Sequence, residues 1–180
     1  MSQLIEQGKF KNVFEVENNK GAAYLKMRIE WEKRCFHSLY DFTNDSERPK
    51  YGALNFTCKN IFAATPYGSC VATLKNLRQV CTIAPGDTSV TSVIGVLDFC
   101  NHIINTFTDD ELRTIDEIAN GLNNPIDIKR FAGYKEIQIH GDIHVRDHIE
   151  SIAFAGDTPA ERECMELLKR SYPQIIVKKL

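Results

Sequence analysis

The stretch Tyr134-Lys135-Glu136-Ile137-Gln138-Ile139-His140-Gly141 decides the fold class that the sequence predicts. Its apolar residues Ile137 and Ile139 alternate with polar ones, which is typical of a β-strand that turns one face toward a hydrophobic core. The alternation places three polar side chains about 7 Å apart on the opposite face, namely Glu136, Gln138 and His140. Such a row can form a catalytic face, or it can be the solvated side of a half-buried sheet.

Further strands and helices are predicted outward from this stretch. Short β-capable runs bounded by turns cover residues 50–56, 70–74 and 80–83, and a closing strand covers 175–177. Apolar spacing and capping signals predict helices over residues 22–40, 92–107 and 108–121, and from 159 onward. The order of these elements predicts an α+β fold, with N-terminal helices and a mixed, mainly antiparallel sheet in a single domain over residues 1–180.

Composition argues against several functional classes. Of the 180 residues, 43% are hydrophobic and 26% are charged, which indicates a globular rather than a disordered chain. The 24 acidic and 22 basic side chains leave a net charge of -2, so there is no overall basic excess for a nucleic-acid backbone and no nucleic-acid partner is expected. No apolar run approaches the roughly 20 residues of a membrane-spanning helix, so no membrane partner is expected either.

The cysteines and the N-terminus bear on the cellular location. Six cysteines occur singly, without a CxxC pair, at Cys35, Cys58, Cys70, Cys81, Cys100 and Cys164. A chain of this length needs no disulfides to hold its core, so we expect free thiols and a cytoplasmic location. The first residues lack the basic start and apolar run of a secretion signal. Delivery into a host or competitor cell as an effector stays open, because an effector can lack such a signal.

Two other segments carry groups suited to a polar ligand. In Arg48-Pro49-Lys50-Tyr51-Gly52, proline fixes the approach to a strand and glycine lets a ligand come close to the backbone. The guanidinium of Arg48 suits a phosphate or a carboxylate because its donors form a rigid fork. In Tyr67-Gly68-Ser69-Cys70, a hydroxyl and backbone N–H groups can face a ligand at the entrance to a strand. Each segment can also be an ordinary surface turn.

Three histidines recur at steps of four residues, at His140, His144 and His148. On one helix this spacing would gather three imidazoles on one side, as a zinc site requires. Gly141 interrupts such a helix and the sequence has no HExxH motif, so no metal ligands are predicted. The sequence also has neither a P-loop nor a GxGxxG motif, which excludes nucleotide binding through those loops.

The chain resembles an uncharacterised, mainly bacterial family over roughly residues 8–150. That family has an RPKYGALN block, which is similar to Glu47-Arg48-Pro49-Lys50-Tyr51-Gly52-Ala53-Leu54-Asn55 here. Its GSC strand and its ExQIHG strand resemble residues 67–70 and 136–141. The helix around Trp31-Glu32 and the pair Phe14-Glu15 are also similar, whereas residues 15–21 depart from the glycine-rich pattern of the family.

The layout of these motifs is similar to that of mono-ADP-ribosyltransferases of the arginine–serine–glutamate type. The resemblance maps their three motif residues onto Arg48, Ser69 and Glu136. It implies that NAD is a substrate, that Glu136 stabilises the positive charge developing on the ribose, and that Arg48 holds the pyrophosphate or a ribose. Ser69 would orient the glutamate or the ribose. The substrate-binding residues that this resemblance implies are Tyr134, Tyr51, Gly52, Gly68, Tyr67, Gln138 and His140.

The expected function is therefore NAD-dependent mono-ADP-ribosyl transfer to a protein or small acceptor, as performed by bacterial effectors and toxins. Two alternatives remain. One is a non-catalytic interaction or immunity-type protein, in which Arg48 and Glu136 form a plain ion pair. The other is a metal-assisted hydrolase built on the three histidines.

Overall fold

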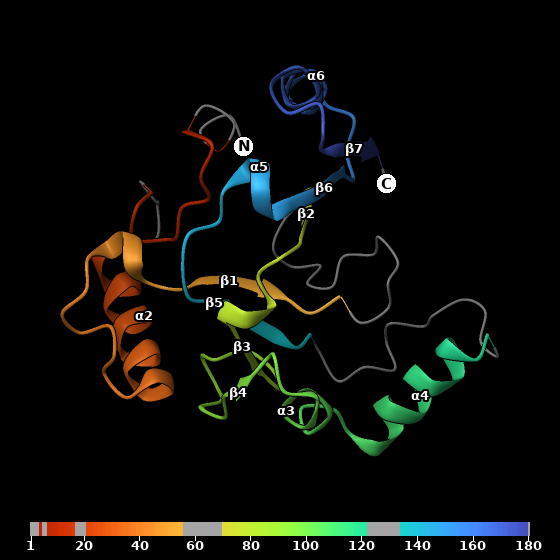
Figure 1. Ribbon diagram of the computed structural model, residues 1–180. Helices are drawn as coiled ribbons and strands as arrows, with labels where there is room; N and C mark the ends of the chain where they lie inside the picture. Colours follow the sequence, from red (N-terminus) through yellow and green to blue (C-terminus); the bar gives the residue numbers. More distant parts are fainter. Residues whose placement is uncertain (1–3, 5–6, 17–20, 56–69, 122–133, 180) are drawn as a thin grey trace.

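The strands in the described part of this protein form two sheets (Figure 1). The computed structural model describes residues 4, 7–16, 21–55, 70–121 and 134–179. One sheet is antiparallel and has the order β1-β5-β3-β4, with the strands Lys50–Ala53, Glu136–Ile139, Cys81–Ala84 and Gly95–Val96. The other has the order β2-β6-β7, with the strands Cys70–Leu74, Ile149–Phe154 and Ile176–Lys179. Among the described strand pairs, only β6–β7 is parallel. The predicted α+β class is confirmed, although the strands form two sheets rather than one.

Strand β5, which the alternating sequence predicted, lies inside the first sheet between β1 and β3. Its isoleucines face a core cluster that includes Leu77, Ile83 and Ile143. All four residues of β5 are buried, so the polar face is covered as well. The interpretation of that face as solvated is therefore wrong, because Phe36 of helix α2 and Tyr40 of the following loop contact His140, and the turn at Thr88 covers Glu136.

Helix α2, Gly21–Phe36, is shorter than the predicted range 22–40. The chain leaves the helix through His37 and Ser38, which both have positive φ values. The buried side chains of α2 are Arg28, Glu32 and Cys35, which share one face of the helix. This helix therefore contacts the sheet through polar side chains, a pattern that its apolar spacing did not indicate.

The prediction of a helix over residues 92–107 is wrong for the first half of this range. The structure has β4 there, followed by the short helix α3, Cys100–Ile104. Gly95 disfavours a helix, and its position in β4 lets the backbone approach α3, since a Cβ at Gly95 would lie 2.9 Å from Cβ of His102. The side chain of His102 also accepts a hydrogen bond from the backbone N–H of Val96 at 3.0 Å.

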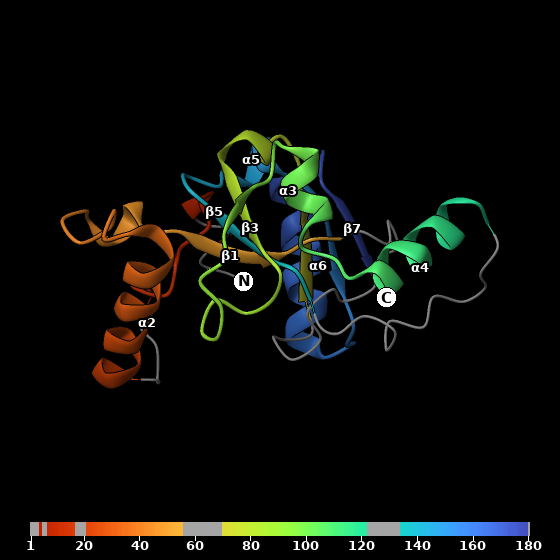
Figure 2. The same cartoon turned by 90° about the horizontal axis from the view of Figure 1, so that it is seen from below.

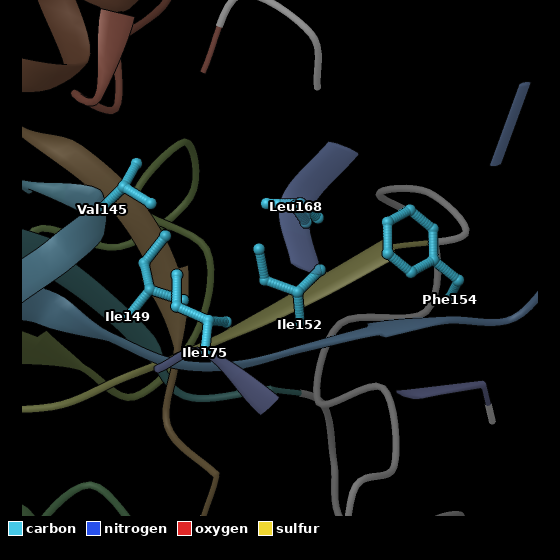
Figure 3. Close-up of a cluster of buried hydrophobic side chains, with 6 residues drawn as sticks. All are labelled: Val145, Ile149, Ile152, Phe154, Leu168 and Ile175. Atoms are coloured by element: carbon cyan, nitrogen blue, oxygen red, sulfur yellow. The ribbon is translucent and has the colours of Figure 1, made fainter. Parts of the chain in front are cut away.

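The second sheet encloses a core of its own (Figure 3). Its buried members are Val145, Ile149, Ile152, Phe154, Leu168 and Ile175. They come from the short helix α5, Val145–His148, from β6, from helix α6, Pro159–Ser171, and from the segment before β7. Strand β6 was not predicted, because its residues 151–154 are buried on both faces of the strand and lack the alternation of a half-buried one. The predicted start of α6 is confirmed by the capping box of Thr158 and Glu161.

Helix α4, Asp109–Ala119, begins at the predicted capping box, in which Thr108 Oγ1 accepts from the backbone N–H of Glu111. Figures 1 and 2 show α4 at the periphery, on the far side of the sheet from α2. The ammonium of Lys135 lies 2.9 and 3.1 Å from the two carboxylate oxygens of Glu111. Both side chains are buried, and this ion pair joins α4 to the segment that enters β5.

Two expectations from composition can be compared with the described part of the chain. None of its helices has the length and apolar character needed to cross a bilayer. Its five cysteines, Cys35, Cys70, Cys81, Cys100 and Cys164, are free thiols as predicted, and Cys58 lies outside the described residues.

Candidate functional site

Glu136 is a buried carboxylate at the start of β5, with only 4% of its surface exposed. Its Oε1 accepts hydrogen bonds from Oγ1 of Thr88 at 2.5 Å, from the backbone N–H of Thr88 at 3.3 Å and from Nε2 of Gln138 at 3.1 Å. Its Oε2 lies 3.4 Å from the hydroxyl of Tyr134, which also lies 3.0 Å from a carboxylate oxygen of Asp87. Within the described residues, every hydrogen-bond partner of this carboxylate is a neutral donor.

The turn after β3 brings Thr88 over Glu136. The backbone N–H of Ser89 donates to Oδ1 of Asp87 at 2.7 Å, which fixes the turn that the Pro85-Gly86-Asp87 sequence predicted. From the other side, the guanidinium of Arg34 on α2 donates to the carbonyl oxygens of Thr88 and Ser89 at 2.7 and 2.9 Å. Helix α2 thus holds the turn that supplies two donors to Glu136.

Gln138 and His140 continue the same polar face, as the alternation predicted. Oε1 of Gln138 accepts from the hydroxyl of Thr82 at 2.8 Å, and this hydroxyl lies 2.8 Å from Nε2 of His140. The hydroxyl of Tyr40 contacts Nδ1 of His140. The Phe36 ring packs edge-on against the imidazole, with ring centroids 5.1 Å apart. Both ring nitrogens of His140 are therefore occupied by protein groups.

Burial lowers the pKa of His140 below its ordinary value of 6.5. The unfolded chain therefore binds a proton at this residue more readily than the folded chain, and stability contributed by the neutral imidazole is lost as the pH falls below about 6.5. We expect the free energy of unfolding to decrease between about pH 7 and pH 5.5, and to decrease less in His140→Gln. Urea unfolding of both proteins at the two pH values measures this, and equal decreases would contradict it.

Arg48 lies near the other end of the same sheet face and is bound to Glu32 of α2. Its Nη1 is 2.6 Å from Oε2 of Glu32, and the two residues are 6% and 2% exposed. Oε1 of Glu32 accepts from the hydroxyl of Tyr51 at 3.3 Å, and the guanidinium of Arg28 stacks 3.9 Å from the centre of the Tyr51 ring. We call Arg28, Glu32, Arg48 and Tyr51 the polar seam.

Burial dominates the electrostatics of the polar seam. Desolvation raises the pKa of Glu32, although the hydrogen bond and charge of Arg48 and the charge of Arg28 oppose this increase. Desolvation likewise raises the pKa of Tyr51. The Nε atoms of Arg28 and Arg48 are buried without a hydrogen-bond partner among the described residues. The seam thus has two guanidinium groups around one carboxylate.

The sheet register separates Arg48 from Glu136. In the register of β1 and β5, Glu136 is paired with Ala53 and Ile139 is paired with Lys50. Arg48 precedes Lys50 and therefore lies beyond the end of β5 that is opposite to Glu136. Five residues of extended chain span roughly 17 Å. The ion pair between Arg48 and Glu136 that the interaction alternative expected is therefore wrong, since the partner of Arg48 is Glu32.

The other predicted substrate-binding residues are divided between the two faces of the sheet. Tyr51 is paired with Gln138 in the sheet register, so its side chain lies on the same face as that of Glu136. Gly52 is paired with Ile137 and lies on the face of the isoleucines. A Cβ at Gly52 would meet no described atom within 4 Å, so there is open space at this glycine, on the face of the sheet opposite Glu136. Three further predicted residues, Tyr67, Gly68 and Ser69, lie outside the described residues.

The three histidines do not form one site. The ring nitrogens of His140 are bound by Tyr40 and Thr82, whereas His144 and His148 lie together at α5, with ring centroids 5.8 Å apart. The described ranges hold no group of three or more His, Cys, Asp or Glu side chains that could bind a metal ion. A depression of about 400 Å³ occurs on α6, but it is lined by other residues, Glu163, Glu166, Leu167 and Arg170.

Several residues of this polar face were missed in the sequence. They are Arg28, Glu32, Tyr40, Thr82 and Thr88. One signal could have identified the first two, because Arg28, Glu32 and Cys35 recur at helical spacing and so place polar groups on one face of α2. Thr82 and Thr88 had no such signal, since their partners come from β5, about 50 residues away in the sequence.

Comparison with known proteins identifies a family. Residues 1–113 match the family model DUF3626, described as a protein of unknown function. The matched region contains α2, β1 and Arg48, and it ends before β5 and Glu136. No curated protein matches the chain. Because the family model covers more than half of the sequence, the chain belongs to the DUF3626 family.

Proposed function

We propose that this protein is a mono-ADP-ribosyltransferase that consumes NAD and uses Glu136 as its catalytic carboxylate. The observation that carries the proposal is the setting of Glu136, which is buried and held only by neutral donors within the described residues. A buried carboxylate without a cation beside it is tolerated only when hydrogen bonds satisfy it. Its charge is then available to a cation that develops next to it in a site of low dielectric constant.

The reaction that fits such a carboxylate breaks the bond between nicotinamide and ribose. The bonding electron pair leaves with the neutral nicotinamide, and positive charge develops on the ribose. A nucleophilic group of the acceptor then forms a bond to the same ribose carbon and releases its proton to solvent water. Glu136 stabilises the positive charge and accepts a hydrogen bond from a ribose hydroxyl. NAD is thus consumed as a substrate, and the acceptor is a protein or a small molecule.

Two further features support this proposal. The strand after Arg48 and the strand of Glu136 are neighbours in one sheet, so the arginine and glutamate motifs belong to one layer. The hydroxyl of Tyr134 lies 3.4 Å from Oε2 of Glu136, so this side chain brings an aromatic ring, which can stack on nicotinamide, to the vicinity of the carboxylate. Arg48 acts indirectly in this scheme, because its pair with Glu32 holds α2, and α2 holds the Thr88 turn. Since Glu136 is 4% exposed, the Thr88 turn has to move for a ribose to reach it.

The test is nicotinamide release from NAD by the purified chain, with water or a protein lysate as acceptor. We expect Glu136→Gln to lower kcat by about 10²–10³-fold, the usual cost of losing one direct electrostatic contact to the reacting group. Glu150→Gln is the matched control, because Glu150 is also on a strand but is exposed. Equal rates for wild type and Glu136→Gln, or no NAD cleavage by the wild type, would refute the proposal.

A second candidate function, a non-catalytic binding protein, is favoured by the buried pair of Arg48 and Glu32. In this pair Glu32 binds the guanidinium of Arg48, which the resemblance expects to bind NAD. Thermal unfolding with and without NAD separates the two candidates. A ligand present at 100 times its dissociation constant adds about 2.7 kcal/mol to the stability of the folded state. An unchanged melting temperature across millimolar NAD, together with absent NAD cleavage, would support the binding protein.

A further inference from the structure

Five polar side chains form a continuous row of hydrogen bonds that ends at Glu136. The row starts at Tyr40 in the loop after α2, crosses the sheet through His140, Thr82 and Gln138, and reaches Oε1 of Glu136. The last three hydrogen bonds measure 2.8, 2.8 and 3.1 Å. Gln138 is fully buried, so its amide depends on these partners.

The chemistry of the acceptors fixes the direction of every hydrogen bond in the row. An ionised carboxylate only accepts, so the amide of Gln138 points its NH₂ group to Glu136 and its oxygen to Thr82. The single hydroxyl proton of Thr82 is then donated to Gln138, and Oγ1 of Thr82 must accept from Nε2–H of His140.

The same reasoning fixes the proton on His140. Its neutral ring carries a proton on Nε2, which leaves Nδ1 to accept from the hydroxyl of Tyr40. The neutral form agrees with the environment of the ring, because the side chains that contact it here, Tyr40, Phe36 and Thr82, are all uncharged. All donors therefore point toward Glu136, and aligned hydrogen bonds strengthen one another.

The row has a geometric effect on the carboxylate. Oε1 of Glu136 accepts from Gln138 and twice from Thr88, whereas the hydrogen bond that the described residues give to Oε2 is the 3.4 Å contact with Tyr134. The carboxylate is thus held through one oxygen. Its other oxygen retains lone pairs for a further donor.

We infer that Thr82, Gln138 and His140 are positioning residues that fix Oε1 of Glu136 and direct Oε2 to the ribose hydroxyl of the substrate. The functional part of this inference rests on the proposed role of Glu136 in cleaving NAD. The physical part, a one-directional row that sets the proton on His140, does not depend on that role.

Nitrogen-15 NMR of the imidazoles tests the physical part in the full chain without any substrate. At about pH 7.5, where a neutral imidazole predominates, we expect His140 to carry its proton on Nε2 in the wild type and in Thr82→Ser. In Thr82→Val the acceptor for this proton is removed, so the ring should shift toward the form protonated on Nδ1, which donates to Tyr40. If Thr82→Val does not fold, Thr82→Ala removes the same hydroxyl. A wild-type ring protonated on Nδ1, or identical spectra for wild type and Thr82→Val, would overturn the inference.

Steady-state kinetics of NAD cleavage tests the functional part. We expect Thr82→Val to lower kcat about tenfold with an unchanged KM, less than the 10²–10³-fold typical of a group that touches the reacting charge. Thr82→Ser should recover most of this loss. A change in KM alone, or equal losses in both variants, would overturn the positioning role. If the wild type cleaves no NAD, the proposed function and this positioning role fail together, and the NMR result alone decides whether the row sets the His140 proton.

Discussion

Replacing Glu32 by glutamine is expected to lower the free energy of unfolding by about 3–5 kcal/mol, the usual cost of removing one partner of a buried ion pair. Glu32 is the carboxylate of the polar seam, and it lies 2.6 Å from the guanidinium of Arg48. Its loss leaves the buried guanidinium of Arg48 with the exposed carboxylate of Asp45, 3.7 Å from its Nε, and removes the buried charge that opposes that of Arg28. Both arginines already have a buried Nε without a hydrogen-bond partner in the described part of the chain. Glutamine keeps the size of the side chain, so the effect reports charge rather than packing.

Urea unfolding followed by circular dichroism measures this difference. Glu30→Gln is the control on the same helix, because Glu30 is exposed and a surface substitution changes stability by no more than about 0.5 kcal/mol. Similar midpoints for the two variants would show that the ion pair of Arg48 and Glu32 contributes little. A large difference would instead establish Arg48 as a residue that stabilises the fold through α2.

Replacing Lys135 by methionine is expected to detach α4, with a loss of about 3–5 kcal/mol for that part of the molecule. Methionine replaces the apolar stem of the lysine but not its ammonium, which lies 2.9 Å from a carboxylate oxygen of Glu111. Glu111 is 1% exposed, so its charge would be left buried beside an apolar side chain. The contact of the ammonium with the Phe107 ring, 4.9 Å from the ring centre, is lost as well.

Amide hydrogen exchange of residues 109–119 measures the detachment directly. Because α4 lies at the periphery, protection of its amides from exchange should fall, whereas amides in the core around Ile152 should remain protected. Arg113→Met is the control, since Arg113 pairs with Asp110 on the exposed side of the same helix and such pairs contribute about 0–1 kcal/mol. Unchanged exchange over α4 in Lys135→Met would exclude this ion pair as the anchor of the helix.

The elements with strong local signals were predictable from the sequence. The alternation around Ile137 and Ile139 identified β5, and the threonines that begin α4 and α6 were recognisable because a capping box lies within four residues. The row of Glu136, Gln138 and His140 on one face also followed from the alternation.

What surrounds that row could not be predicted, because it depends on contacts between distant segments. Nothing local to Glu32 indicates that Arg48 and Tyr51 will bury it, since both partners come from a later segment of the chain. The apolar residues from Val93 to Ile104 predicted one long helix, but Gly95 and Val96 extend the sheet instead. Pairing with β3 is a tertiary interaction, and it overrode a clear helical pattern.

The short strand β4 has a consequence for how copies of this protein behave together. A sheet edge with unpaired backbone groups can recruit another chain, which leads to aggregation. Here the edge is two residues long, and the imidazole of His102 on α3 accepts the N–H of Val96. A second molecule therefore finds little backbone to pair with at this border, although the apolar side chains of Val93 and Phe99 beside it are exposed to solvent. This border thus discourages fibril-like growth through strand addition.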